Sequence, residues 1–147
     1  MQNRGLIIKK KFDASHFIKN HQGGCANMHG HTYHVDFHFN FKDQPLNKLN
    51  MLFDFKEIDY LLDHILKEYD HHCINGMMPY GTYVGGSNTS IEGCFKTLNN
   101  PTAEYMAEIL FEQTNNLLKE TLQLTYNGLY RIIVWETDKY AATYEEV

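Results

Sequence analysis

Alternation of apolar and polar residues with a period of two predicts four β-strands in this chain. The clearest alternation covers residues 31–41, where every odd position from Tyr33 onward is aromatic or aliphatic. Residues 6–17 alternate in the same way, and shorter strand patterns cover residues 130–136 and 140–145. Because strands joined by short connections pair antiparallel, we expect a sheet of antiparallel strands.

Two other segments show the three- and four-residue spacing of amphipathic helices. Asp54 followed by Glu57 resembles a capping box and predicts the start of the first helix. Asn100, with Pro101 at the first helical position, predicts the start of the second. The apolar stripes are Ile58, Leu61, Leu62, Ile65, Leu66 and Tyr69 in the first helix, and Met106, Ile109, Leu110, Leu117 and Leu118 in the second. We therefore predict an α+β fold: a four-stranded antiparallel sheet with two helices on one face.

The length of 147 residues, 43% of them hydrophobic, fits a single domain over residues 1–147. One feature departs from this regular plan. Residues 76–99 are rich in Gly, Ser, Asn and Thr and form a longer connection than is usual. We interpret this segment as a loop insertion.

The charge pattern excludes several classes of partner. Thirteen Lys and Arg against 18 Asp and Glu give a net charge of −5, so the chain lacks the broad basic field that nucleic acid or an anionic membrane would need. No apolar run reaches the length of a signal-peptide core or a membrane span. Three cysteines are too few and odd in number for a disulfide framework. We expect a soluble cytoplasmic protein with at least one free thiol.

The histidines carry the first indication of chemistry. His29 and His31 are two residues apart on a predicted strand, so both side chains leave the same face. His16 lies on the apolar side of the neighbouring strand. Three imidazoles in one dry place would give Zn²⁺ a site with the fourth position open, the catalytic arrangement. Each histidine alone is better read as an ordinary hydrogen-bonded residue, but their shared parity favours a zinc site at His16, His29 and His31.

Four further residues could contribute chemistry. Cys25 lies four residues before His29 and could be a fourth ligand, a free thiolate acting as base, or an incidental loop residue. Asp70 and His71 could form a proton relay, although adjacent side chains rarely hydrogen-bond to each other. Glu136, near the end of a strand, could hold a cationic ligand edge or could be a solvated strand-end residue.

Six short motifs in a fixed order resemble those of the 6-pyruvoyltetrahydropterin and 6-carboxytetrahydropterin synthase family. They are FDASH (12–16), CANMHGH (25–31), FDF (53–55), DHH (70–72), NPTAE (100–104) and WET (135–137). The resemblance implies the tunnelling fold, in which subunits assemble into a β-barrel, with a homo-oligomer, most simply a hexamer, and active sites between subunits. It implies zinc as the cofactor and a pterin triphosphate as the substrate.

The resemblance also assigns roles to individual residues. His16, His29 and His31 would hold zinc, Cys25 would abstract a proton, and His71 with Asp70 would act as a relay. Glu136 would anchor the guanidine-like edge of the pterin and complete the relay. Thr102 and Glu104 would be pocket residues.

The spacing of Cys25 from the HGH motif resembles that of the 6-carboxy-5,6,7,8-tetrahydropterin synthases of the queuosine route. The implied reaction converts 7,8-dihydroneopterin triphosphate to 6-carboxytetrahydropterin, acetaldehyde and triphosphate. Two alternatives remain: a 6-pyruvoyltetrahydropterin synthase that only eliminates triphosphate, and a non-catalytic zinc-containing pterin-binding module. The long segment before Asn100 departs from the family pattern, and no motif for binding the triphosphate is evident.

Overall fold

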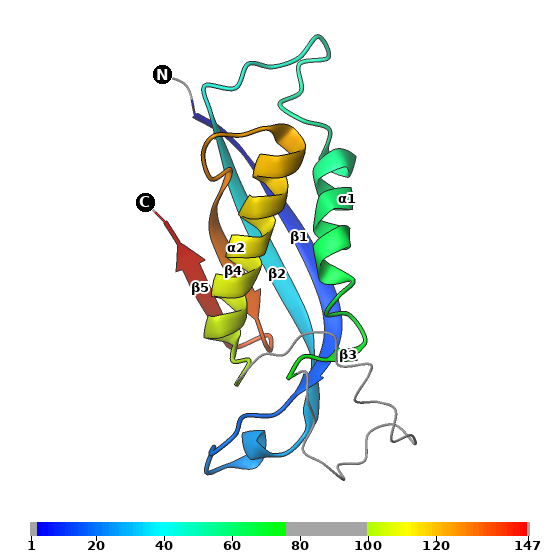
Figure 1. The fold of residues 1–147 in the computed structure, drawn as a ribbon, viewed down its shortest axis with the longest axis vertical. Helices are drawn as coiled ribbons and strands as arrows, with labels where there is room; N and C mark the ends of the chain where they lie inside the picture. Colours follow the sequence, from blue (N-terminus) through cyan, green and yellow to red (C-terminus); the bar gives the residue numbers. More distant parts are fainter. Residues whose placement is uncertain (1–2, 76–99, 147) are drawn as a thin grey trace.

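The computed structural model describes residues 3–75 and 100–146, so the expected loop insertion at 76–99 lies outside the described residues. The elements in chain order are β1 (Asn3–His16), the short 3₁₀ turn η1 (Gly24–Ala26), β2 (His29–Lys42), α1 (Phe55–Leu66), β3 (His72–Cys73), α2 (Ala103–Leu122), β4 (Leu129–Trp135) and β5 (Ala141–Glu145). Figure 1 shows that the two long strands β1 and β2 run the length of the molecule.

The sheet has five strands in the order β3-β1-β2-β4-β5 and is mixed. The prediction of four antiparallel strands is therefore wrong in one respect, because β3 pairs parallel with β1. This strand has only two residues, too few for any alternation to be visible in the sequence. The backbone amides of His71 and Ile74 donate to the carbonyls of Asp13 and Ser15, and these bonds hold the segment after α1 against β1. The other three pairings are antiparallel, as expected.

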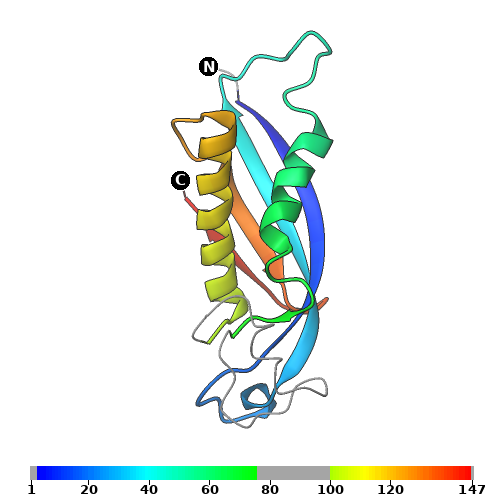
Figure 2. The same cartoon turned by 45° about the vertical axis from the view of Figure 1, so that its right-hand side comes forward.

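Both helices lie on one face of the sheet, so the α+β prediction is confirmed (Figures 1 and 2). Asp54 caps α1, as predicted, and its side chain accepts a hydrogen bond from the amide of Lys56. The predicted start of α2 is displaced by two residues. Thr102 is the N-cap, with its hydroxyl accepting from the amide of Tyr105, and the helix begins at Ala103. Asn100 instead bonds the backbone of Lys19 on another segment.

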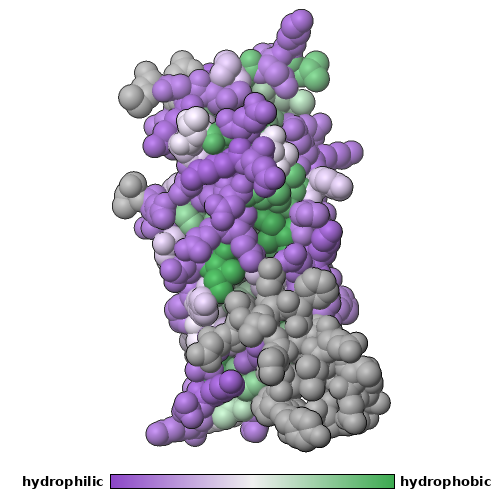
Figure 3. All heavy atoms as spheres, in the orientation of Figure 1, coloured by the Kyte–Doolittle hydropathy of each residue, from purple (hydrophilic) through white to green (hydrophobic). Residues whose placement is uncertain are grey.

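The core lies between the sheet and the helices. From Tyr33 to Phe41, the odd positions of β2 are at most 1% exposed. They face the apolar stripe of α1 and the buried residues of α2, among them Met106, Leu110 and Phe111. The surface on this side is mostly hydrophilic, with one hydrophobic strip between hydrophilic side chains (Figure 3). Among residues 3–75 and 100–146, no helix is long and apolar enough to cross a membrane.

Candidate metal centre

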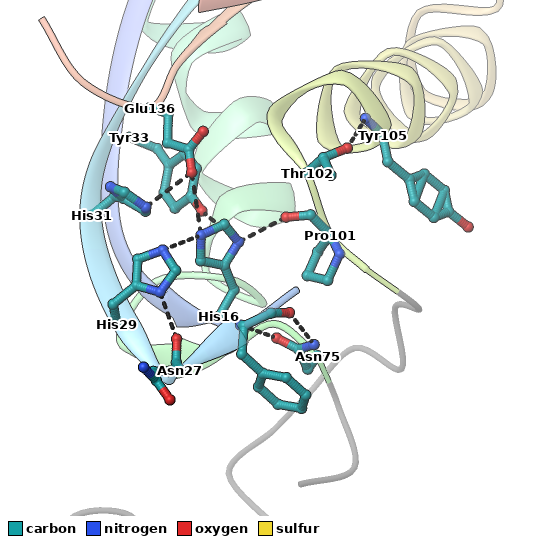
Figure 4. Close-up of polar contacts among 11 residues, drawn as sticks. His16, Asn27, His29, His31, Tyr33, Asn75, Pro101, Thr102, Tyr105 and Glu136 are labelled. Carbon is teal, nitrogen blue, oxygen red and sulfur yellow. Dashed lines mark hydrogen bonds and ion pairs between the residues drawn. The ribbon is translucent and has the colours of Figure 1, made fainter. Parts of the chain in front are cut away.

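The pairing of β1 with β2 brings three histidines together at one end of the sheet. His16 is the last residue of β1 and lies opposite His29, the first residue of β2, while His31 lies opposite Ala14. All three side chains leave the helix-facing side, on the same parity as Tyr33. The ring centroids are 4.6 Å (His16–His29), 5.0 Å (His16–His31) and 4.8 Å (His29–His31) apart. Figure 4 shows the three rings converging on one point.

Two backbone carbonyls fix which ring nitrogens face this point. Nδ1 of His16 donates to the carbonyl of Pro101 at 2.8 Å, and Nδ1 of His29 donates to the carbonyl of Asn27 at 2.7 Å. A carbonyl oxygen can only accept, so we assign the proton of each neutral ring to Nδ1. The two Nε2 atoms therefore carry lone pairs, yet they lie only 3.1 Å apart. Two acceptors at this distance repel each other unless a cation or a proton lies between them.

Glu136 completes the cluster from β4. It directly follows the last residue of that strand, and its amide donates to the carbonyl of Tyr140 across the turn to β5. Its Oε1 lies 2.9 Å from Nε2 of His31 and 3.2 Å from Nε2 of His16. One potential ligand atom from each of the four residues lies within 4.8 Å of the other three. The sequence did not predict that Glu136 would join the histidines.

The cluster shifts the ionisation of its members. The contact with His16, and the positive charge that the three rings carry when protonated, hold the pKa of Glu136 below its ordinary value, although burial opposes this. Burial lowers the pKa of His31, and the neighbouring His16 and His29 add to this, against the opposing charge of Glu136. The cluster therefore favours an ionised Glu136 carboxylate beside a neutral His31 imidazole, and these are the forms that bind a metal ion.

The donor set fits a divalent cation of the zinc type. Nε2 of His31 is buried and makes no hydrogen bond, although Oε1 of Glu136 lies 2.9 Å from it. Ligands at about 2.0–2.1 Å from a tetrahedral Zn²⁺ are separated from one another by about 3.3 Å. The separations between the ligand atoms, 2.9, 3.1 and 3.2 Å, are close to this value. Three imidazoles and one carboxylate are also ligands that zinc commonly takes.

Two neighbours of the cluster, Tyr33 and Asn75, were not predicted from the sequence. Tyr33 is fully buried, and its hydroxyl lies 3.3 Å from Nδ1 of His16; burial raises the pKa of this phenol. Its parity with His29 and His31 could have identified it. The side chain of Asn75 accepts a hydrogen bond from the amide of Phe17 and donates one to the Phe17 carbonyl. These two bonds fix the chain directly after His16. No pattern in the sequence indicated this contact.

Cys25 lies outside the cluster. It is half-buried in η1, and its carbonyl accepts from the amide of Ile18 at 2.7 Å. Among the described residues, its sulfur does not join the group of potential ligands formed by the three histidines and Glu136. Of the interpretations that the sequence left open, the fourth-ligand one is therefore not supported.

Asp70 and His71 form a second, separate group with Asp13. Oδ2 of Asp70 lies 3.0 Å from Nδ1 of His71, and Oδ1 accepts from the amide of Asp13 at 2.9 Å. Burial would raise the pKa of Asp70, but the Asp13 amide and His71 outweigh it and lower this pKa. The backbone of His71 is in the left-handed region, with φ 61°.

This second group and the histidine cluster lie on different sides of the sheet. Asp13 pairs with Thr32, whose hydroxyl donates to its carboxylate, and both are sequence neighbours of the pair Ala14 and His31. Since successive residues of a strand point to opposite faces, the Asp13 carboxylate lies on the face away from the cluster. The side chain of His71 is 76% exposed. A single chain therefore does not bring Asp70 and His71 to its own cluster.

The two remaining candidates lie at the start of α2. Thr102 caps the helix, and Glu104 is exposed in its first turn. The preceding residue, Pro101, provides the carbonyl that holds His16, so this segment does border the cluster (Figure 4).

Comparisons with known proteins agree with this fold. The model of the 6-pyruvoyl tetrahydropterin synthase family matches residues 6–147. A 6-carboxy-5,6,7,8-tetrahydropterin synthase of Haemophilus influenzae is 30% identical over 145 residues, covering 92% of this chain and 94% of that protein. A putative enzyme of the same name from Pyrococcus horikoshii is 39% identical over 72 residues, which are 48% of this chain and 41% of that protein.

Solved structures share the architecture. A 6-pyruvoyl tetrahydropterin synthase from Plasmodium vivax superposes with a TM-score of 0.71 at 16% identity over 99% of both chains. One from Caenorhabditis elegans gives a TM-score of 0.68 at 18% identity, covering 100% of this chain and 98% of the other. At these identities the likeness establishes the fold alone.

Proposed function

The chain belongs to the 6-pyruvoyl tetrahydropterin synthase family, and from this premise we propose that it is a zinc-dependent 6-carboxy-5,6,7,8-tetrahydropterin synthase. It converts 7,8-dihydroneopterin triphosphate to 6-carboxytetrahydropterin, acetaldehyde and triphosphate. The observation that carries the proposal is the meeting of three imidazole nitrogens and one carboxylate oxygen within 4.8 Å of one another. The curated relatives with the carboxy name support the choice of reaction.

His16, His29 and His31 hold the cation in this proposal, with the carbonyls of Pro101 and Asn27 keeping two of the rings in the correct tautomer. A divalent cation bound there supplies the positive charge that stabilises oxygen atoms of the substrate side chain as they lose protons. The Cys25 thiolate removes a proton from that side chain, and the half-buried position of Cys25 leaves it partly accessible.

His71 returns the proton, and Asp70 orients the His71 ring through the 3.0 Å contact. Since one chain separates this pair from its own cluster, we propose that Asp70 and His71 serve the cluster of a neighbouring copy. This arrangement requires a homo-oligomer, a hexamer in the simplest case, in which the active sites lie between subunits and the sheets close into a barrel.

Glu136 binds the guanidine-like edge of the pterin, where a charge-assisted pair orients the ring. Thr102 and Glu104 border the pocket from the start of α2. A 6-pyruvoyltetrahydropterin synthase would use the same residues and stop after elimination of triphosphate. The released product separates the two reactions, because acetaldehyde forms only in the carboxy reaction.

The proposal is tested by replacing the base. We expect Cys25→Ala to keep its bound zinc and to lose turnover of 7,8-dihydroneopterin triphosphate by about 100-fold or more, since general-base catalysis contributes about 10²–10⁴-fold. Cys73→Ala is the matched control: Cys73 is another cysteine, buried in β3 beside Phe17, and we expect this variant to retain turnover.

Turnover is measured as triphosphate and acetaldehyde release, with zinc determined on the same samples. A Cys25→Ala enzyme that works at the parental rate would contradict the assignment of the base. If the parent binds pterin at saturating zinc but releases no triphosphate, the chain is a pterin-binding module.

A further inference from the structure

We propose that Glu136 is itself a ligand of the cation in the substrate-free protein, and that it leaves this position when a pterin offers its carboxylate a new partner. The inference rests on the proposed metal site. It adds a closed resting state to a site for which the sequence predicted three histidines and an open fourth position. One carboxylate would thus have two alternative partners.

The distances place the carboxylate where a fourth ligand belongs. Oε1 of Glu136 lies 2.9 and 3.2 Å from two of the imidazole nitrogens, and those of His16 and His29 are 3.1 Å apart. The oxygen is thus as close to the nitrogens as they are to each other. A residue that only anchored a ligand ring would not need to lie among the donor atoms at all.

Its surroundings explain why an oxygen is held there. Nε2 of His31 is buried without a hydrogen bond, and Nε2 of His16 and of His29 carry lone pairs because their Nδ1 protons go to backbone carbonyls. Nε2 of His16 and Nε2 of His29 therefore offer the carboxylate no proton, although Oε1 of Glu136 lies 3.2 Å from Nε2 of His16. A cation shared by all four groups removes the repulsion and satisfies every one of them.

The local backbone lets the side chain leave without disturbing the fold. The amide of Glu136 is tied to the carbonyl of Tyr140, and the hydroxyl of Thr137 accepts from the amides of Lys139 and Tyr140, so the turn is held by its own bonds. The side chain of Glu136 is 26% exposed, so one of its sides faces solvent. Rotation about side-chain torsions is sufficient for release.

The exchange makes opening of the site depend on the ligand. The guanidine-like edge of a pterin presents parallel N–H donors that suit a carboxylate. A molecule without such an edge has no N–H donors that could replace the cation as the partner of Glu136. The site therefore opens for pterins and stays closed to simple diols, which explains how a cation next to solvent avoids unspecific ligands.

The experiment uses the full-length protein with Co²⁺ in place of Zn²⁺, because visible absorption of Co²⁺ reports changes among its ligands. We expect Glu136→Gln to weaken zinc binding by at least about tenfold and to alter the Co²⁺ spectrum. Asp138→Asn removes a carboxylate from the same turn, where it is exposed and outside the cluster, and should change neither. Neopterin should alter the spectrum of the parent protein, whereas glycerol should not.

A crystal structure of the zinc-loaded, substrate-free parent provides a second test that needs no variant. We expect Oε1 of Glu136 at a normal Zn–O bond length of about 2.0–2.2 Å. A water in the fourth position, with Glu136 turned away, would overturn the inference, as would unchanged zinc affinity and an unchanged Co²⁺ spectrum in Glu136→Gln. Neither result depends on turnover, so the ligand role and the proposed reaction can fail independently.

Discussion

The two ends of β2 use the same face of one strand for opposite purposes. From Tyr33 to Phe41 the inward positions are almost fully buried, and the rings of Phe37, Phe39 and Phe41 stack with interplanar angles of 6–11°. At His29 and His31 the same parity places imidazoles whose nitrogens face other acceptors. The aromatic end is held by apolar contacts, whereas the histidine end, with Glu136, has the ligand atoms to hold a cation.

Stability and function are located in different parts of this fold. The aromatic end stabilises the folded chain by burying apolar surface, whether or not a metal is bound. The histidine end holds acceptors in a dry place, and they contribute favourably only when the cation is bound. Changes at the two ends should therefore affect different measurements.

The largest expected effect is on the aromatic end. Phe39→Ala removes a ring that is 1% exposed and stacked between Phe37 and Phe41, and should lower the free energy of unfolding by about 3–5 kcal/mol. Urea unfolding of the chelator-treated protein measures this without a contribution from the metal. Phe39→Leu, the control, keeps most of the volume and should lose less. If the variant stays folded, its zinc affinity should match that of the parent.

A change at the histidine end should weaken zinc binding and leave the stability of the metal-free protein nearly unchanged. His29→Ala removes one of the proposed ligands and should weaken zinc binding by about 100-fold, or about 2.7 kcal/mol, which titration calorimetry resolves. The free energy of unfolding without metal should change by less than about 1 kcal/mol, because among residues 3–75 and 100–146 the His29 side chain makes a single hydrogen bond outside the cluster, to the carbonyl of Asn27.

His34→Ala is the matched control for that variant. His34 is on the same strand but is exposed, on the opposite face. It should leave zinc binding unchanged. Equal zinc affinity in the His29 and His34 variants would contradict the separation of the two ends.

The smallest expected effect concerns a charged contact outside both regions. Nζ of Lys10 lies 2.7 and 2.6 Å from carboxylates of Asp59 and Asp63 on α1. Burial lowers the pKa of Lys10, but the two aspartates outweigh it and raise this pKa above 10.5. Both aspartates are partly exposed, so Lys10→Met should cost only about 0.5–1 kcal/mol.

The sign of the pH dependence follows from the raised pKa. The contribution of the charged Lys10 is fully present below pH 10.5 and is lost as the pH rises through the higher value of the folded state. The difference in Tm between parent and Lys10→Met should therefore shrink above pH 10.5. A difference that is constant over this range would show that the ion pairs do not contribute.

The fold could be predicted where periodicity extends over many residues. The two long strands and the apolar stripe of α1 have such periodicity. The cap at Asp54 could also be predicted, because the capping-box pattern is local. The two-residue strand β3 did not, because its pairing depends on where α1 ends and on backbone bonds to β1. At α2, Asn100 and Thr102 are both good cap residues, and tertiary contacts of Asn100 with Lys19 decided between them.

The candidate site could be predicted only within the hairpin. The relation between His16, His29 and His31 follows from parity on two adjacent strands. The position of Glu136 depends on the register of β4 against β2 and on the turn that follows, which local pattern does not encode. The separation of Asp70 and His71 from the cluster depends in the same way on the pairing of β3 with β1, which no pattern in the sequence indicated.

The claim on which the rest depends is that His16, His29, His31 and Glu136 hold one divalent cation. Elemental analysis of the protein, purified without chelator and then supplied with excess zinc before desalting, tests it most directly. We predict close to one zinc ion per chain. A folded protein that retains no divalent metal after this treatment would contradict the account.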